Sequence, residues 1–168
     1  EEFGTHVLEE PDADSPDARV LAVSDTRIVL YLPGVEGPKP QAPRLKVLDA
    51  TGNSLVVHEL SAPLTASATT TRIGSGYFVF TGNSVIALHA GTFDPMWTAP
   101  HALGGPALMA GRLLVPVPDA IAALDPSTGA VTTRIPVSRK DHDGSPISIG
   151  VLGTTIFEQR GGELVALG

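Results

Sequence analysis

A strand–turn–strand pattern recurs through the sequence and constrains the fold more than any other feature. Its clearest copy spans residues 120–137: a small apolar run, the turn Asp125–Gly129, and a second run with β-branched residues. In such a turn the Asp125 carboxylate accepts hydrogen bonds from backbone N–H groups, the following proline fixes φ, and Gly129 takes a positive φ without steric penalty. The segment is therefore predicted to form a β-hairpin.

Weaker copies of this pattern lie on both sides of it. A leucine precedes each turn, at intervals of 40, 36 and 43 residues, and these leucines are Leu48, Leu88, Leu124 and Leu167. Short strands that repeat about every 40 to 50 residues are typical of the four-stranded blades of β-propellers. The apolar runs are short and interrupted by many of the 18 glycines and 15 prolines, so almost no helix is expected. The sequence predicts an all-β fold of about four propeller-type blades, or part of a larger seven- or eight-bladed propeller.

The predicted organisation is an N-terminal arm with an acidic linker over residues 1–18 and a propeller repeat domain over residues 19–168. The linker is acidic and proline-containing and has no apolar periodicity, as expected of an exposed connector. The predicted repeat units cover residues 19–61, 62–99, 100–137 and 138–168.

The last unit shows three predicted strands and would leave an open strand edge, which invites pairing. The only N-terminal candidate for completing it is Thr5–Glu9, whose alternation is weak. We expect the chain to be part of a longer propeller, because four blades are at the low end of the usual count and the sequence has no initiator methionine. Association through the open blade edge is the alternative way to cover it.

The third repeat resembles a known family. Gly111–Val115 and Ala123–Gly129 read as glycine and hydrophobic residues followed by Ala-Leu-Asp-x-x-Thr-Gly, and this is similar to the repeat of quinoprotein-type, or PQQ-like, β-propellers. The first repeat keeps Leu48–Gly52, while the second has His89 in place of the aspartate and retains Trp97. The resemblance implies a docking indole wedged between neighbouring blades at Trp97, and it favours a bacterial, extracytoplasmic protein. The structural repeat positions that it implies are Asp49, Gly52, Trp97, Asp125 and Gly129.

Composition excludes several classes of function. The net charge is −7 and the basic residues are scattered, so nucleic-acid binding is not expected. No apolar run approaches the roughly 20 residues that cross a bilayer, so no membrane span is expected. The absence of cysteine removes disulfides, thiolate nucleophiles and cysteine-based zinc sites.

Several groups of residues have some features of a cation site. Asp12–Asp17 and Lys140–Gly144 resemble the first steps of a calcium loop but lack its distal bidentate glutamate, so solvated loops are the preferred interpretation. His89 and His101 could meet Asp94 around one loop, for which turn capping or a surface role is preferred. Quinone-dependent members of the family hold their cofactor with calcium, an aspartate base and often adjacent cysteines. Neither cofactor nor metal is therefore expected here, and no catalytic, cofactor-binding or metal residue is predicted.

These observations predict a non-catalytic binding or scaffold module that recognises a protein, peptide or glycan partner, because propeller loops suit recognition. The alternative is a fragment of a propeller enzyme, a quinoprotein-type oxidoreductase or a hydrolase, whose catalytic parts lie outside this chain.

Overall fold

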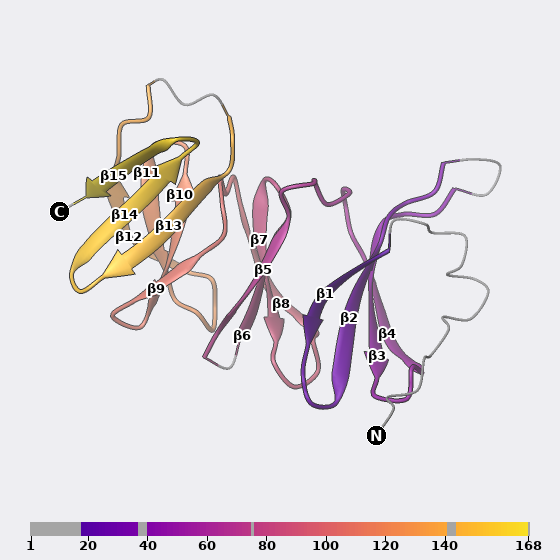
Figure 1. The fold of residues 1–168 in the computed structure, drawn as a ribbon. Coiled ribbons are helices and arrows are strands. Elements are labelled where there is room, and N and C mark those ends of the chain that lie inside the picture. Colours follow the sequence, from indigo (N-terminus) through magenta and orange to yellow (C-terminus); the bar gives the residue numbers. More distant parts are fainter. Residues whose placement is uncertain (1–17, 37–39, 75, 141–143, 168) are drawn as a thin grey trace. The chain divides into compact units, whose positions relative to one another are not determined.

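The computed structural model describes residues 18–36, 40–74, 76–140 and 144–167 (Figure 1). Within these residues fifteen strands form four antiparallel sheets and no helix is present, which confirms the predicted all-β class with four propeller-type blades. The same part of the chain accordingly contains no apolar helix of membrane-spanning length. The chain divides into two compact units, one ending at Leu64 and one beginning at Thr65.

Sheet I makes up the first unit, and each of its strands pairs with the next in sequence order. Its core lies on the two central strands, where Val29 and Val47 are directly paired and fully buried. Leu55 and Val57 on the last strand are about half exposed, as expected for an outer strand with one side open. The strands are β1 (Arg19–Val23), β2 (Arg27–Leu32), β3 (Arg44–Asp49) and β4 (Ser54–Glu59).

Sheets II, III and IV make up the second unit and repeat this meander. Sheets II and III have four strands, and sheet IV has three among the described residues, as predicted for the last repeat. Sheet II comprises β5 (Thr69–Ile73), β6 (Gly76–Phe80), β7 (Ser84–His89) and β8 (Pro95–Pro100). Sheet III comprises β9 (Ala107–Met109), β10 (Arg112–Val117), β11 (Ala120–Leu124) and β12 (Val131–Pro136). Sheet IV comprises β13 (Ile147–Leu152), β14 (Thr155–Arg160) and β15 (Glu163–Leu167).

The same irregularity recurs near the end of the third strand in sheets I to III. The pairing with the fourth strand shifts register at Leu48, Leu88 and Leu124, and such a bulge increases the local twist. Leu167 has the same place in sheet IV, because it pairs with Ile156 on the preceding strand just as Leu124 pairs with Leu113. The four leucines thus occupy equivalent positions, which confirms the repeat predicted from their spacing.

Sheet III contributes both of its faces to hydrophobic cores, which explains why β11 and, after Arg112, β10 are apolar. On β10, Leu113 and Val115 belong to the core shared with sheet II, whereas Leu114 belongs to the core shared with sheet IV. The first core also contains Phe78, Phe80, Val85, Ala87, Ala122 and Leu124. The second also contains Ile121, Ala123, Val137 and Ile156, with Ile149, Val151 and Leu167 packed against it.

The structure departs from the sequence-based expectation at β8. The sequence by itself predicts a loop from His89 to Trp97, because this segment contains Gly91 and Pro95, but Pro95–Pro100 is the fourth strand of sheet II. Its prolines lie at the two ends of an outer strand, where a missing N–H is tolerated. The candidate closing strand Thr5–Glu9 lies outside the described residues.

Candidate functional site

The turn that follows β3 is organised by one carboxylate. Asp49 Oδ1 accepts hydrogen bonds from the backbone N–H groups of Thr51 and Asn53 at 2.9 Å each, and from the Thr51 hydroxyl at 2.7 Å. Gly52 has a φ of 88° and donates its N–H to the Asp49 carbonyl at 3.1 Å. Because the side chains of Thr51 and Asn53 hydrogen-bond to the charged form, the pKa of Asp49 is lowered to about 2. Asp49 and Gly52 therefore serve the turn.

The turn that follows β11 has the same design. Asp125 Oδ1 accepts from the N–H groups of Ser127 at 2.9 Å and Thr128 at 3.0 Å, and Gly129 has a φ of 70°. The backbone hydrogen bonds from Thr128 and Ser127 lower the pKa of Asp125. Arg112 adds an exposed ion pair to the same carboxylate at 3.2 Å. Asp125 is thus held ionised as the acceptor of its own turn.

His89 takes the place of the aspartate in sheet II. Its Nδ1 lies 3.2 Å from the backbone nitrogens of both Gly91 and Thr92. A ring nitrogen that accepts these N–H groups carries no proton, so the proton of the neutral imidazole lies on Nε2. The imidazole therefore caps the turn. Among the described residues no group of three or more His, Asp or Glu side chains is placed to hold a metal ion.

Trp97 connects sheet II to the carboxylate-centred turn of sheet III. The indole is half-buried against the first core, and its Nε1 donates to the Pro126 carbonyl at 3.0 Å. Its ring also packs against Phe78, with 5.8 Å between centroids. A Cβ atom on Gly129 would lie 2.6 Å from the indole Cδ2, so the glycine is required by close approach as well as by its φ. Trp97, Asp125 and Gly129 thus meet around one turn, while Asp49 and Gly52 form the corresponding turn of sheet I.

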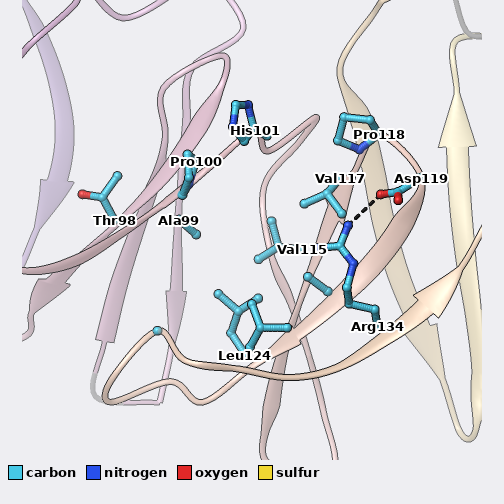
Figure 2. Close-up of a pocket in the computed structure, with 13 residues that line it drawn as sticks. Thr98, Ala99, Pro100, His101, Val115, Val117, Pro118, Asp119, Leu124 and Arg134 are labelled. Carbon is cyan, nitrogen blue, oxygen red and sulfur yellow. Dashed lines mark hydrogen bonds and ion pairs between the residues drawn. The ribbon is translucent and has the colours of Figure 1, made fainter.

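A pocket of about 520 Å³ lies between β8 and the strands β10 to β12 (Figure 2). Thr98 and Ala99 of β8 form one side of it (Figure 2). The hollow is lined by small residues such as Ala99, Ala122 and Gly129, which leave the space between the two sheets incompletely filled. The remaining lining is mostly aliphatic: Val115, Val117, Leu124 and Val131.

Charged and polar residues also line the pocket. Arg134 on β12 forms an ion pair with Asp119 at 2.7 Å, and the two side chains are 52% and 77% exposed (Figure 2). His101 follows β8 and has a φ of 60°, a conformation that is uncommon outside glycine and concentrates at functional sites. The pocket therefore combines an aliphatic lining with a donor and an acceptor that solvent, or a ligand, can reach.

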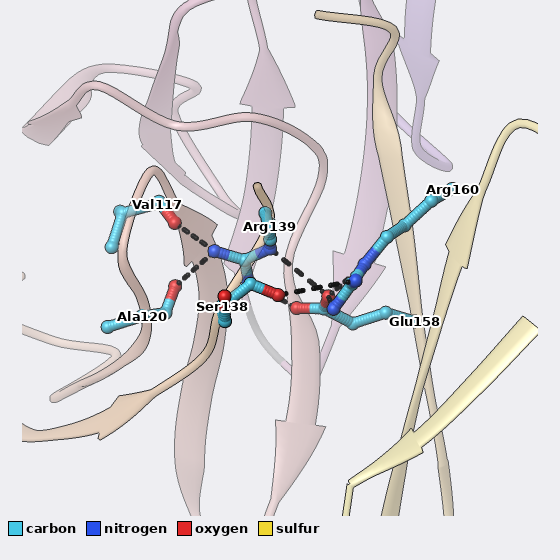
Figure 3. Close-up of polar contacts among 6 residues, drawn as sticks. All are labelled: Val117, Ala120, Ser138, Arg139, Glu158 and Arg160. Carbon is cyan, nitrogen blue, oxygen red and sulfur yellow. Dashed lines mark hydrogen bonds and ion pairs between the residues drawn. The ribbon is translucent and has the colours of Figure 1, made fainter. Parts of the chain in front are cut away.

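A buried ionic cluster connects the loop after β12 to sheet IV (Figure 3). Arg139 and Glu158 form a two-point ion pair through Nε and one terminal nitrogen, and their side chains are 2% and 0% exposed. Arg160 donates to Glu158 Oε2 through Nε at 3.0 Å and a terminal nitrogen at 2.8 Å. Burial by itself raises the pKa of Glu158, but the hydrogen bonds and charges of Arg139 and Arg160 outweigh this effect and lower it.

The cluster also fixes one wall of the pocket. The second terminal nitrogen of Arg139 donates to the carbonyls of Val117 and Ala120, which flank the β10–β11 turn that carries Asp119 (Figure 3). The Asp119 carbonyl in turn accepts from the N–H of Val137 at 3.0 Å. Arg139 thus holds the β10–β11 turn in place beside the pocket.

Sequence reasoning identified neither the pocket nor the cluster. The signal for the cluster was Glu158, a charged residue at an inward position two residues after Ile156 and paired with Ile149, both of which face sheet III. The two calcium-like stretches gave no site that can be described, because Asp12–Asp17 and residues 141–143 lie outside the described residues.

Comparison with known proteins gives little additional information. No protein-family model matches the chain, and no match is found among the curated proteins. Among solved structures the chain is similar to the glutaminyl cyclase of Myxococcus xanthus, with a TM-score of 0.38 and 14% identity over 84% of this chain and 66% of that one. A likeness at this level carries neither the fold nor the activity of that enzyme to this chain.

Proposed function

We propose that the chain is a non-catalytic, propeller-type binding module and that the pocket between β8 and β10–β12 binds a segment of a protein or peptide partner. The observation that carries the proposal is the combination of an aliphatic hollow of about 520 Å³ with polar groups beside it. Pockets of this size and character are the usual sites for ligands of peptide or small-molecule size.

A peptide suits this pocket better than a glycan. An aliphatic lining accommodates an apolar side chain, whereas the described residues of the lining include no Phe, Tyr or Trp against which a sugar ring would pack. The ion pair beside it supplies both functions that a peptide backbone needs, because Asp119 accepts from an N–H and Arg134 donates to a carbonyl. Both side chains are exposed enough that a ligand can replace the water bound to them or their contact with each other.

We also propose that the repeats, over residues 19–168, are of the PQQ-like type. Two features support this assignment. The turns at Asp49 and Asp125 share one hydrogen-bonding design, and the indole of Trp97 is packed on the Gly129 turn of the next sheet. The type of repeat concerns architecture and brings no quinone chemistry with it.

The test is selection from a random peptide library on the immobilised chain. We expect enriched peptides to share one bulky aliphatic residue, and we expect Val131→Asp to lose them, because it places a charge in the aliphatic lining at an exposed position. Leu108→Asp is the matched control, since Leu108 is also about half exposed on sheet III but lies outside the pocket.

The outcomes separate the hypotheses. Loss of binding in Val131→Asp with binding retained in Leu108→Asp supports the proposal. If the Val131→Asp and Leu108→Asp variants retain the same peptides equally well, the proposal is contradicted. Binding of glycans in place of peptides contradicts it too. Peptides that are recovered with a changed mass would instead favour the enzyme alternative.

A further inference from the structure

The space between sheets II and III that contains the pocket has a counterpart between sheets III and IV. In sheet II, Ala99 on β8 pairs with Val85, three residues before the leucine at the register shift. In sheet III, Ile135 on β12 pairs with Ile121, which has the same place relative to its leucine. Ala99 packs against the core shared by sheets II and III, and Ile135 packs against the core shared by sheets III and IV. A branched side chain thus fills the place that a methyl group takes beside the pocket.

The next sheet contributes a second difference between the two spaces. Val115 has in sheet III the place that Glu158 has in sheet IV, because Val115 pairs with Ala122 as Glu158 pairs with Val165. The pocket therefore has an apolar wall where the other space has a buried carboxylate. A charged side chain of a ligand would lose its hydration there without a buried partner of opposite charge. The hollow accordingly selects uncharged side chains.

The loops that follow β8 and β12 contribute a third difference. Ala102 and Val137 are equivalent positions in these loops, because the N–H of each donates at 3.0 Å to the carbonyl of the residue that precedes the third strand of its sheet. Two residues further on, the loop after β12 has Arg139, whose side chain is buried in the ionic cluster, and the loop after β8 has Gly104. A Cβ atom on Gly104 would overlap the carbonyl oxygen of Ile147, so this position can hold no side chain. The pocket thus lacks side chains that fill the equivalent space between sheets III and IV.

We propose that the pocket takes one uncharged, branched aliphatic side chain of the partner, about the size of isoleucine, in the place that Ile135 fills between sheets III and IV. Ala99 determines this preference, because its small side chain leaves the room that such a group needs. The inference rests on the proposed peptide binding and adds to it the side chain that is recognised. The lining suits a branched group, since Val115, Leu124 and Val131 present branched surfaces to it (Figure 2).

The first test measures melting temperatures and needs no ligand. Ala99→Ile places in the hollow the side chain that sheet III has at the equivalent position, and it should raise the melting temperature by about 2–8 °C, as cavity-filling substitutions do. Ala99→Val should give a smaller rise. Ala166→Ile is the matched control, because it makes the same change at an exposed position on β15, outside the pocket, and it should shift the melting temperature by less than about 2 °C. A fall with both Ala99 variants, or a rise in the control as large as that of Ala99→Ile, would overturn the proposal.

The second test compares the binding of library-selected peptides to the parent chain, Ala99→Ile and Ala166→Ile. We expect the selected peptides to share isoleucine, valine or leucine at one position. Alanine at that position of the peptide should weaken binding about tenfold or more, because it removes the apolar group from the hollow. Ala99→Ile should weaken binding by about as much, because its own side chain occupies the hollow. Ala166→Ile should bind the peptides as the parent does.

The outcomes separate this inference from the proposed function. Peptides that are lost in Val131→Asp but share an aromatic or charged residue would overturn the inference and leave the pocket as the binding site. The same holds for peptides that are lost in Val131→Asp but bind Ala99→Ile as tightly as the parent. Enrichment of no peptide at all would overturn both. Loss of binding in Ala99→Ile together with a raised melting temperature supports the inference, because the variant is then folded and its hollow is filled.

Discussion

Replacing Glu158 by glutamine should destabilise the second unit strongly while barely changing the size of the side chain. Glu158 is fully buried and receives hydrogen bonds from both Arg139 and Arg160. The substitution removes the negative charge and leaves two guanidinium groups close together, one of them 2% exposed. Removal of one partner from a buried ion pair costs about 3–5 kcal/mol, and we expect a loss of unfolding free energy in that range.

Asp119→Asn is the matched control, because it makes the same chemical change in an exposed ion pair. Asp119 and Arg134 are 77% and 52% exposed, although their 2.7 Å contact is short. Exposed pairs contribute about 0–1 kcal/mol. The difference in unfolding free energy between the two variants thus measures how much burial increases the contribution of an ion pair in this unit.

Urea unfolding followed by tryptophan fluorescence is a suitable assay, since Trp97 is the single tryptophan of the sequence and belongs to the same unit. The pH dependence provides a second check. Glu158 has a lowered pKa in the folded state, so its contribution is present above the ordinary pKa of 4.5 and is lost as the pH falls below it. The difference in unfolding free energy between the parent and Glu158→Gln should therefore decrease at acid pH. Equal destabilisation by Glu158→Gln and Asp119→Asn at neutral pH would refute the reasoning.

Three further predictions concern the turns. Gly129→Ala should destabilise the second unit by about 1–3 kcal/mol more than Gly153→Ala in urea unfolding. Both glycines have a positive φ, but only a Cβ atom on residue 129 would displace Trp97. Equal losses of unfolding free energy would contradict the role of the glycine–indole contact. His89→Asp should keep or raise the melting temperature, because a carboxylate accepts the same N–H groups as the imidazole, and a marked fall would argue against turn capping. Asp125→Ala should lower the unfolding free energy at neutral pH, and the difference from the parent should shrink only as the pH falls from the ordinary pKa of 3.8 through the lowered pKa of the folded carboxylate; a difference independent of pH would contradict the assigned role.

The sequence predicted the local structure well because that structure depends on neighbouring residues. The spacing of Leu48, Leu88, Leu124 and Leu167 located the third strand of every sheet, since the turns that follow the first three leucines are built from consecutive residues. The strand β8 was missed because its two prolines suggest a loop, and only its pairing with β7 makes Pro95–Pro100 a strand.

The candidate site was not predictable because it depends on contacts between sheets. The pocket exists where Ala99, Ala122 and Gly129, distant in sequence, face a common space, and nothing local distinguishes them from other small residues. The ion pair of Arg139 with Glu158 joins residues that are 19 positions apart. A glutamate within the alternating pattern of β14 indicates that a buried partner is required, but it does not identify Arg139.

Methyl NMR spectra of the chain, recorded while a selected peptide is added, test the proposed binding function most directly. We predict saturable shifts at the methyl groups of Val115, Val117, Leu124 and Val131, with those of Leu152 and Leu164 unchanged by the peptide. Shifts that cluster away from the pocket, or no saturable shift with a peptide that the chain selected, would contradict it.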